Sequence, residues 1–126
     1  MAKTVRVVFL GGVGEIGKNM TAIEYDDDII IVDCGAEFPH DDSPGIDAII
    51  PDVTYIRENL HKLRGIVLTH GHEDHIGAVQ YYGEEFGVPV YGTALTLGLL
   101  QRKLGERNAP VKLVEVKEGD TITLGC

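Results

Sequence analysis

The sequence is short of basic residues, of cysteine and of long apolar runs. Its 126 residues carry 11 Lys and Arg against 20 Asp and Glu, a formal net charge of −9, so the composition shows no basic surface adapted to grip phosphates. Two cysteines, Cys34 and Cys126, are too few for a disulfide framework and favour a reducing compartment. The longest apolar runs are far below the ~20 residues that cross a bilayer, and the N-terminal residues lack the apolar core of a signal peptide. We therefore expect a cytoplasmic protein with no membrane segment.

The rest of the composition is typical of one soluble globular domain. Hydrophobic residues make up 44% of the chain and charged residues 25%, which excludes a disordered or fibrous protein. Glycine is frequent, with 16 residues spread among the apolar runs, and this pattern indicates tight turns and close backbone approaches rather than flexible linkers. No internal repeat or low-complexity segment divides the chain.

Hydrophobic patterning predicts a mixed α/β fold. The apolar, β-branched runs predict strands at residues 5–10, 20–25, 29–32, 65–69, 88–91, 111–116 and 121–124. Helices are predicted at residues 52–60, 76–86 and 93–104, with Asp52 and Thr93 as N-caps and Gly105 ending the last helix. The acidic residues 26–28 predict a hairpin turn, and residues 33–51, rich in Gly, Pro and Asp, predict a long loop.

The strongest functional signal is a cluster of histidines and acidic residues directly after the strand predicted at residues 65–69. Three of the five histidines fall within six residues, in the pattern HxHxDH formed by His70, His72, Asp74 and His75. Side chains two residues apart in an extended chain point to the same side, and a helix beginning near Asp74 would turn Asp74 and His75 toward the same space. Imidazole nitrogens and a carboxylate oxygen are typical zinc ligands, with manganese or iron as alternatives. Four ligands in one loop predict two metal ions about 3.5–4 Å apart.

The alternative for this cluster is a set of polar residues in a surface loop, which would be the favoured interpretation for a single histidine. The clustering directly after a strand favours the metal site. Glu73 is expected to be solvated, because its side chain should point away from the other residues of the motif. His40 and His61 precede the motif and are expected to be ordinary surface residues.

Four stretches of the sequence resemble one enzyme family. HxHxDH is the signature of the metallo-β-lactamase fold, and the segments LGGVGEIGKNM (10–20), DCGAEFP (33–39), GIDAIIPD (45–52) and LTHGHEDHIGA (68–78) resemble ribonuclease J, of the β-CASP branch of that fold. The resemblance covers essentially the whole chain and implies the N-terminal part of an αββα sandwich. It also implies a hydrolase that cleaves single-stranded RNA, as an exonuclease or an endonuclease, with two Zn²⁺ ions or with Mn²⁺ as the alternative.

The resemblance assigns roles to particular residues. His70 and His72 match the two histidines that hold the first metal, and Asp74 and His75 match the residues that hold the second. Asp74 is also the candidate catalytic residue. Asp33 matches an aspartate that supports the ligand loop rather than binding metal, as a carboxylate that orients a ligand histidine commonly does. The alternative for Asp33 is a loop cap.

The sequence departs from the family pattern after the HxHxDH motif. The family completes its metal sites with a further histidine, a bridging aspartate and a late histidine, whereas this chain has no histidine after His75 and only one aspartate, Asp120. We therefore expect residues 1–126 to be the N-terminal portion of a metallo-β-lactamase domain, without the rest of that domain, the β-CASP insertion or a C-terminal domain. We expect this portion to be inactive alone, and the longer protein could form a homo-oligomer.

A second motif in the sequence suggests a different function. Residues 12–17 read GxGxxG after a predicted strand, and Asp33 ends a later strand, as in a dinucleotide-binding fingerprint. That fingerprint needs a helix after the third glycine, and the residues that follow are short and β-rich. A glycine-rich turn bordering the metal site explains the same glycines.

Three classes of function are compatible with the sequence. The first is the metal-dependent ribonuclease. The second is a small-molecule hydrolase of the same fold that acts on thioesters or lactams, although residues 10–20 are not typical of glutathione-thioester hydrolases. The third is a non-catalytic chain that binds a metal or a partner. The net charge of −9 argues mildly against RNA binding, but bound metal ions would themselves attract phosphate.

Overall fold

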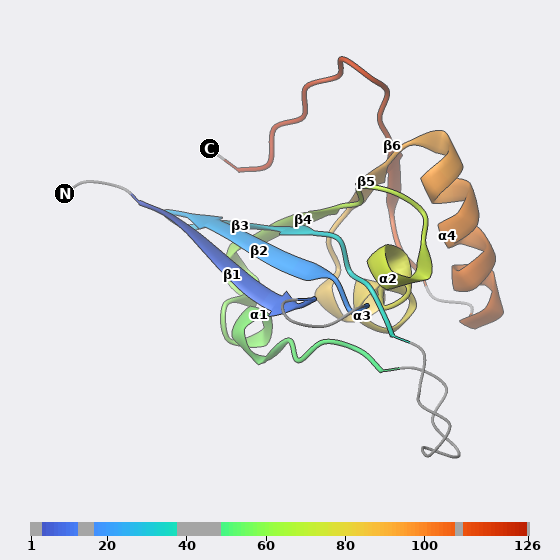
Figure 1. Cartoon of the computed structure of the whole chain (residues 1–126). Helices are drawn as coiled ribbons and strands as arrows, with labels where there is room; N and C mark the ends of the chain where they lie inside the picture. The colour runs from blue at the N-terminus through green and yellow to red at the C-terminus, as the bar shows by residue number, and fades with distance from the viewer. Residues whose placement is uncertain (1–3, 13–16, 38–48, 108–109, 126) are drawn as a thin grey trace.

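The computed structural model describes residues 4–12, 17–37, 49–107 and 110–125. Its elements follow the predicted mixed α/β order (Figure 1). The strands are β1 (Val5–Gly11), β2 (Met20–Tyr25), β3 (Asp28–Val32), β4 (Leu63–Val67), β5 (Val90–Gly92) and β6 (Leu113–Glu115). The helices are α1 (Thr54–Glu58), the short 3-10 helix η1 (Leu60–Lys62), α2 (Glu73–Ile76), α3 (Val79–Phe86) and α4 (Ala94–Arg107).

The six strands form one sheet in the order β1-β2-β3-β4-β5-β6. β1, β2 and β3 are antiparallel neighbours, and β3 through β6 are parallel. The predicted acidic hairpin is confirmed, because Tyr25 pairs with Asp28 and Asp26 takes a φ of 55° in the two-residue turn between them. Parallel strands place their carboxyl ends at one edge of a sheet, so the loops after β3 and β4 start side by side.

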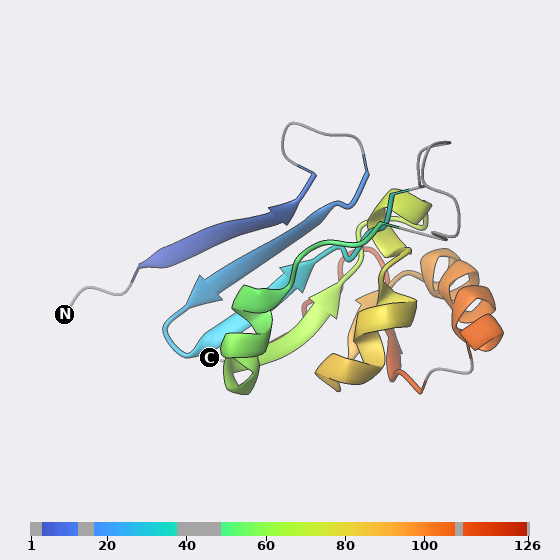
Figure 2. The same cartoon turned by 90° about the horizontal axis from the view of Figure 1, so that it is seen from below.

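The helices lie on one side of the sheet, as the view from below shows (Figure 2). Alternate residues of the strands point to this side and are fully buried, among them Ile31 of β3, Ile66 of β4 and Val90 of β5. They pack in one core with apolar residues of the helices, such as Ile56 of α1 and Leu100 of α4. This core fixes the ends of β3 and β4, from which the two neighbouring loops start.

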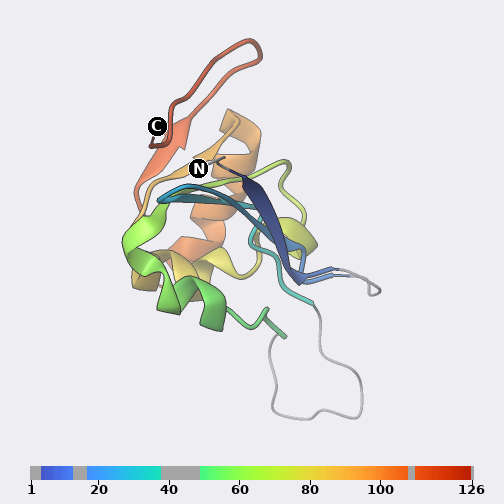
Figure 3. The same ribbon diagram turned by 90° about the vertical axis from the view of Figure 1, so that its left-hand side faces the viewer.

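None of the described helices covers the opposite side of the sheet, where the chain after β6 runs (Figure 3). Phe9 of β1 is 63% exposed there, and Leu124 comes within 3.3 Å of the place where a Cβ on Gly65 would sit. One sheet with helices on a single face is the arrangement expected for one half of a sandwich. No described helix is long and apolar enough to cross a membrane.

Several predicted boundaries are wrong, for local reasons. Asp52 lies one residue before the N-cap position of α1, although its Oδ1 accepts a bond of 2.9 Å from the Thr54 N–H. The helix predicted at residues 76–86 begins later, as α3 at Val79, and the separate short helix α2 precedes it at Glu73–Ile76. Thr93 does cap α4, accepting a long bond of 3.5 Å from the Thr96 N–H. However, α4 continues through Gly105 to Arg107, because Leu100 and Leu104 pack into the core and hold its last turns.

The end of the chain also differs from the sequence-based expectation. β6 is shorter than predicted, and residues 121–124 form no strand in the part of the chain that the structure describes. The turn before them is present, closed by a bond of 2.8 Å from the Lys117 N–H to Asp120 Oδ2. β6 is the last strand of the sheet and pairs only with β5, and residues 121–124 do not add a strand to its free side.

Candidate metal centre

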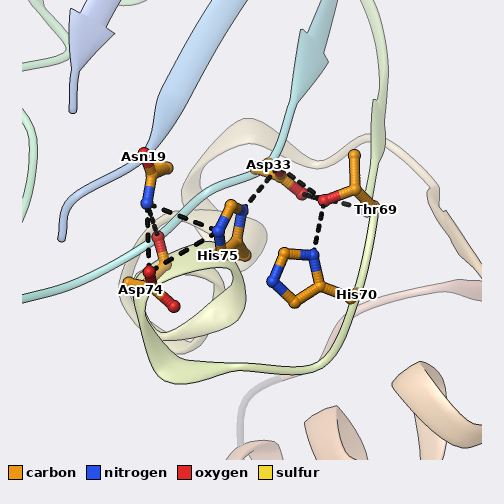
Figure 4. Close-up of polar contacts among 6 residues, drawn as sticks. All are labelled: Asn19, Asp33, Thr69, His70, Asp74 and His75. Atoms are coloured by element: carbon orange, nitrogen blue, oxygen red, sulfur yellow. Dashed lines mark hydrogen bonds and ion pairs between the residues drawn. The ribbon is translucent and has the colours of Figure 1, made fainter. Parts of the chain in front are cut away.

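Three segments of the chain meet at the edge of the sheet where β3 and β4 end (Figure 4). Asp33 is the first residue after β3, and the HxHxDH loop follows β4 and leads into α2. β2 runs antiparallel to β3, so Asn19, immediately before β2, arrives at the same edge. The backbone joins these segments, since Asn19 N–H donates to Asp74 O at 3.0 Å and Cys34 N–H donates to His75 O at 2.8 Å.

Three side chains of the loop bring possible ligand atoms together. One donor atom from each of His70, Asp74 and His75 lies within 4.8 Å of the others. The rings of His70 and His75 are 3.8 Å apart between centroids, and His75 Nε2 lies 3.5 Å from Asp74 Oδ2. Each of the three side chains keeps some exposure, so an ion could enter from solvent.

His72 lies beside this group rather than inside it. Its ring meets the His70 ring edge-on at a centroid distance of 4.8 Å, and its backbone forms the N-cap of α2. Among the described residues, the group of gathered donor atoms does not include His72. The His70 and His72 rings thus contact each other, while only His70 of the two joins Asp74 and His75 in the gathered donor group.

Asp33 ties the two gathered histidines together. It is 6% exposed, and its Oδ2 lies 2.8 Å from His75 Nδ1. Its carboxylate also accepts bonds from Thr69, at 2.8 Å from the backbone N–H to Oδ1 and at 2.8 Å from Oγ1 to Oδ2. Thr69 Oγ1 lies in turn 3.0 Å from His70 Nδ1.

This arrangement selects the ring nitrogens that face one another. If His75 donates its Nδ1–H to Asp33, its Nε2 keeps a lone pair. The Thr69 hydroxyl donates its proton to the Asp33 carboxylate, so toward His70 it can only accept, from Nδ1–H. His70 Nε2 therefore also keeps a lone pair. A carboxylate that fixes the tautomer and angle of a histidine is the usual outer partner of a metal ligand.

Two residues of this network were not singled out from the sequence. Thr69 connects Asp33 to His70, and Asn19 donates from Nδ2 to Asp74 O at 3.0 Å and to Asp74 Oδ2 at 3.3 Å. Asn19 lies 55 positions before Asp74 in the chain, so no spacing rule could pair them. The only available signal was its place at the end of the glycine-rich stretch.

The dinucleotide-binding alternative does not fit the structure. β2 begins at Met20, three residues after Gly17, and runs antiparallel to β1. A dinucleotide-binding fingerprint requires a helix at that point and a parallel strand after it. Gly12 instead lies against Asn19, beside the candidate metal centre, and residues 13–16 lie outside the described residues.

The other predicted residues lie away from the centre or make different contacts. Glu73 is not simply solvated, because it forms an ion pair with Lys103 of α4. His61 is exposed in η1, before β4 begins, and His40 lies outside the described residues. Cys34 is fully buried, burial raises the pKa of its thiol, and among the described residues it is not part of the gathered donor group.

A pocket of about 750 Å³ opens beside the donor group. His72 and Asp74 line it from the loop, and Leu99 lines it from α4. Leu99 packs so closely on the loop that a Cβ on Gly71 would come within 2.5 Å of its Cδ1. His72 and Asp74 thus border an open space that Leu99 of α4 bounds on one side.

Comparisons with known proteins agree with this geometry. The family model described as the metallo-beta-lactamase superfamily matches residues 13–126. The chain belongs to this superfamily. The predicted fold class is thereby confirmed, and the family's divalent metal binding agrees with the two imidazoles and one carboxylate of the gathered donor group.

Curated relatives in this superfamily confirm the resemblance to ribonuclease J. The chain is 50% identical over 111 residues to ribonuclease J 2 of Staphylococcus aureus strain MRSA252, and 49% identical over 111 residues to ribonuclease J 2 of Staphylococcus saprophyticus. Each match covers 88% of this chain and 20% of the relative. The chain therefore spans about a fifth of the length of the curated relatives that it matches.

Solved structures support the superfamily fold. A protein of unknown function from Enterococcus faecalis V583 matches with a TM-score of 0.70 and 21% identity, over 98% of this chain and 36% of that protein. The metallo-beta-lactamase fold protein YhfI from Bacillus subtilis matches with a TM-score of 0.60 and 17% identity, over 96% of this chain and 49% of that protein. These matches concern the fold alone.

The role of Asp33 in this superfamily member leads to a first prediction. Replacing Asp33 by asparagine keeps the size of the side chain but supplies only one acceptor oxygen for His75 and Thr69. We expect the Asp33→Asn chain to fold and to bind zinc about 10–100-fold more weakly, the range typical of outer partners of metal ligands. Isothermal titration calorimetry with Zn²⁺ measures this, with Asp27→Asn in the exposed β2–β3 turn as the control. Equal zinc affinity in Asp33→Asn and Asp27→Asn would refute the role.

Proposed function

We propose that this chain is the N-terminal portion of a dinuclear, metal-dependent ribonuclease that cleaves single-stranded RNA. The observation that supports this most is the 50% identity to ribonuclease J 2 over 88% of the chain, combined with a gathered His-Asp-His donor group at the edge of the sheet. The proposal includes a cytoplasmic location, and it keeps homo-oligomer formation as a property of the longer protein.

We assign the ligands from the loop as the sequence resemblance implies. His70 and His72 would hold one ion and Asp74 and His75 the other, with zinc as the expected metal and manganese as the alternative. The structure already gathers donor atoms of His70, Asp74 and His75, whereas His72 would need to turn its ring toward the group. Bound ions would act as Lewis acids and offset negative charge on the phosphate oxygens of RNA.

The protein's own residues contribute orientation. Asp33 and Thr69 hold the two gathered imidazoles so that the Nε2 atoms keep their lone pairs toward the centre. The pocket lined by His72, Asp74 and Leu99 leaves room for a substrate beside the donor group. Asp74 combines a place in the donor group with a place in the pocket lining, which makes it the best candidate for the catalytic residue.

The test of this function uses a longer protein that contains this sequence. It should cleave single-stranded RNA, lose cleavage on chelation, and regain it with Zn²⁺ or Mn²⁺. Asp74→Ala should lower the rate by about 100-fold or more, because even outer partners of metal ligands commonly account for 10–100-fold, while Asp27→Ala in the exposed turn should not change it. The cleavage products from end-labelled RNA separate exonuclease from endonuclease action.

Two other outcomes would change the proposal. Efficient turnover of a thioester or a lactam with no RNA cleavage would assign the protein to small-molecule hydrolysis in the same superfamily. Metal binding with no hydrolysis of any of these substrates would leave a metal-binding role. For residues 1–126 alone we expect no metal-dependent RNA cleavage above background, since four ligands without a bridging aspartate hold two ions poorly. Cleavage by this chain that disappears in His70→Ala would contradict that expectation.

A further inference from the structure

Asn19 lies between Gly12 and the candidate metal centre. Its Nδ2 donates to Asp74 O at 3.0 Å and to Asp74 Oδ2 at 3.3 Å, and it lies 3.5 Å from His75 Nε2. Its backbone N–H also donates to Asp74 O at 3.0 Å, and its backbone oxygen accepts from Gly35 N–H at 2.9 Å. Asn19, which directly precedes β2, thus contacts both the backbone oxygen and the carboxylate of Asp74 in α2 (Figure 4).

The orientation of the Asn19 amide is determined by its surroundings. A carboxylate and a carbonyl are acceptors only, so the amide must turn its NH₂ group toward Asp74. Its Oδ1 then faces Gly12, where a Cβ would come within 2.5 Å of that oxygen. Gly12 also has a φ of 85°, which favours glycine. The glycine at this position therefore leaves the space that the Asn19 side chain occupies.

We infer that Asn19 is a positioning residue that orients the Asp74 carboxylate toward the metal. Its NH₂ group holds Oδ2, which leaves Oδ1 as the second oxygen of the same carboxylate to meet an ion. A carboxylate fixed by an outer hydrogen bond loses less freedom when a metal binds, so the metal binds more tightly. This inference rests on the proposed metal centre, and it gives Gly12 an indirect part in the site through its contact with Asn19.

The test measures zinc affinity rather than activity. Calorimetric titration of the 126-residue chain with Zn²⁺ should show Asn19→Ala binding about 10–100-fold more weakly than the unsubstituted chain. Asn19→Leu, which nearly keeps the side-chain size but has no donor, should weaken binding to a similar degree. The matched control is Asn59→Ala, since Asn59 makes an equivalent Nδ2 bond of 2.8 Å to a backbone oxygen, that of Tyr55.

A double-mutant cycle separates positioning from a general structural effect. If Asn19 acts through the Asp74 carboxylate, Asn19→Ala should change zinc affinity less than about twofold in an Asp74→Ala background. An equal loss in both backgrounds would overturn the inference, as would unchanged affinity in Asn19→Ala and Asn19→Leu. Loss of the metal-free fold in both variants, seen by circular dichroism, would show a structural role instead. Zinc binding that is absent from the unsubstituted chain would contradict the metal centre itself, and with it this role.

Discussion

Replacing His70 by alanine is expected to weaken zinc binding by this chain by about 100-fold or more, because outer partners alone account for 10–100-fold and His70 would be a ligand. The unsubstituted chain should bind zinc measurably, since His70, Asp74 and His75 already gather their donor atoms. Metal binding also depends on pH, because the imidazoles must be neutral to bind. Calorimetric titration at neutral pH measures both affinities.

Two further histidine variants make this prediction specific. His61→Ala should bind zinc as the unsubstituted chain does, because His61 is exposed in η1 at the far end of β4. His72→Ala should weaken binding less than His70→Ala, since only the His70 ring faces Asp74 and His75. The same affinity in His70→Ala as in the unsubstituted chain would refute the ligand assignment. A loss in His61→Ala as large as that in His70→Ala would refute it too.

Replacing Gly35 by alanine is expected to lower the free energy of unfolding by about 3 kcal/mol, the upper part of the usual range for a side chain forced into occupied space. A Cβ on Gly35 would lie 1.7 Å from the backbone oxygen of Asp74, so α2 would have to move away. That oxygen accepts bonds from both the backbone and the side chain of Asn19, and these bonds would be strained or lost. Zinc binding should weaken together with stability.

Gly98 offers a matched control for this substitution. It lies in the interior of α4, and a Cβ there would meet nothing within 4 Å. Gly98→Ala should therefore raise the free energy of unfolding by roughly 0.5–1 kcal/mol, the usual gain for replacing glycine in a helix. Urea unfolding followed by circular dichroism measures both variants. A Gly35→Ala chain as stable as the Gly98→Ala chain would show that the contact between residues 34–36 and α2 is not as close as described.

Local sequence patterns predicted which elements form the site, but they did not predict the contacts between those elements. The HxHxDH cluster after β4, the acidic hairpin and the position of Asp33 after β3 follow from short-range rules of strand and turn chemistry. The contact of Asn19 with Asp74 and the ion pair of Glu73 with Lys103 join residues far apart in sequence. Such contacts depend on how the strands pair, which no local pattern contains.

Tertiary packing also explains the helix and strand boundaries that local propensity missed. Gly105 would end an isolated helix, but the buried Leu104 before it keeps α4 against the core. Residues 121–124 have the composition of a strand and cross the uncovered side of the sheet without pairing in it. The residue types of this segment favour a strand, but a strand forms only where a neighbouring strand pairs with it.

The most direct test of the central claim locates the metal itself. Crystals of the 126-residue chain grown with Zn²⁺ can be measured at the zinc absorption edge, where the anomalous signal marks each ion. We predict one ion with ligand atoms of Asp74 and His75 about 2.0–2.2 Å away, and a second ion beside it held at the same distance by nitrogens of His70 and His72. An anomalous peak only at other residues, such as His61, with none beside His70, Asp74 and His75, would contradict the account.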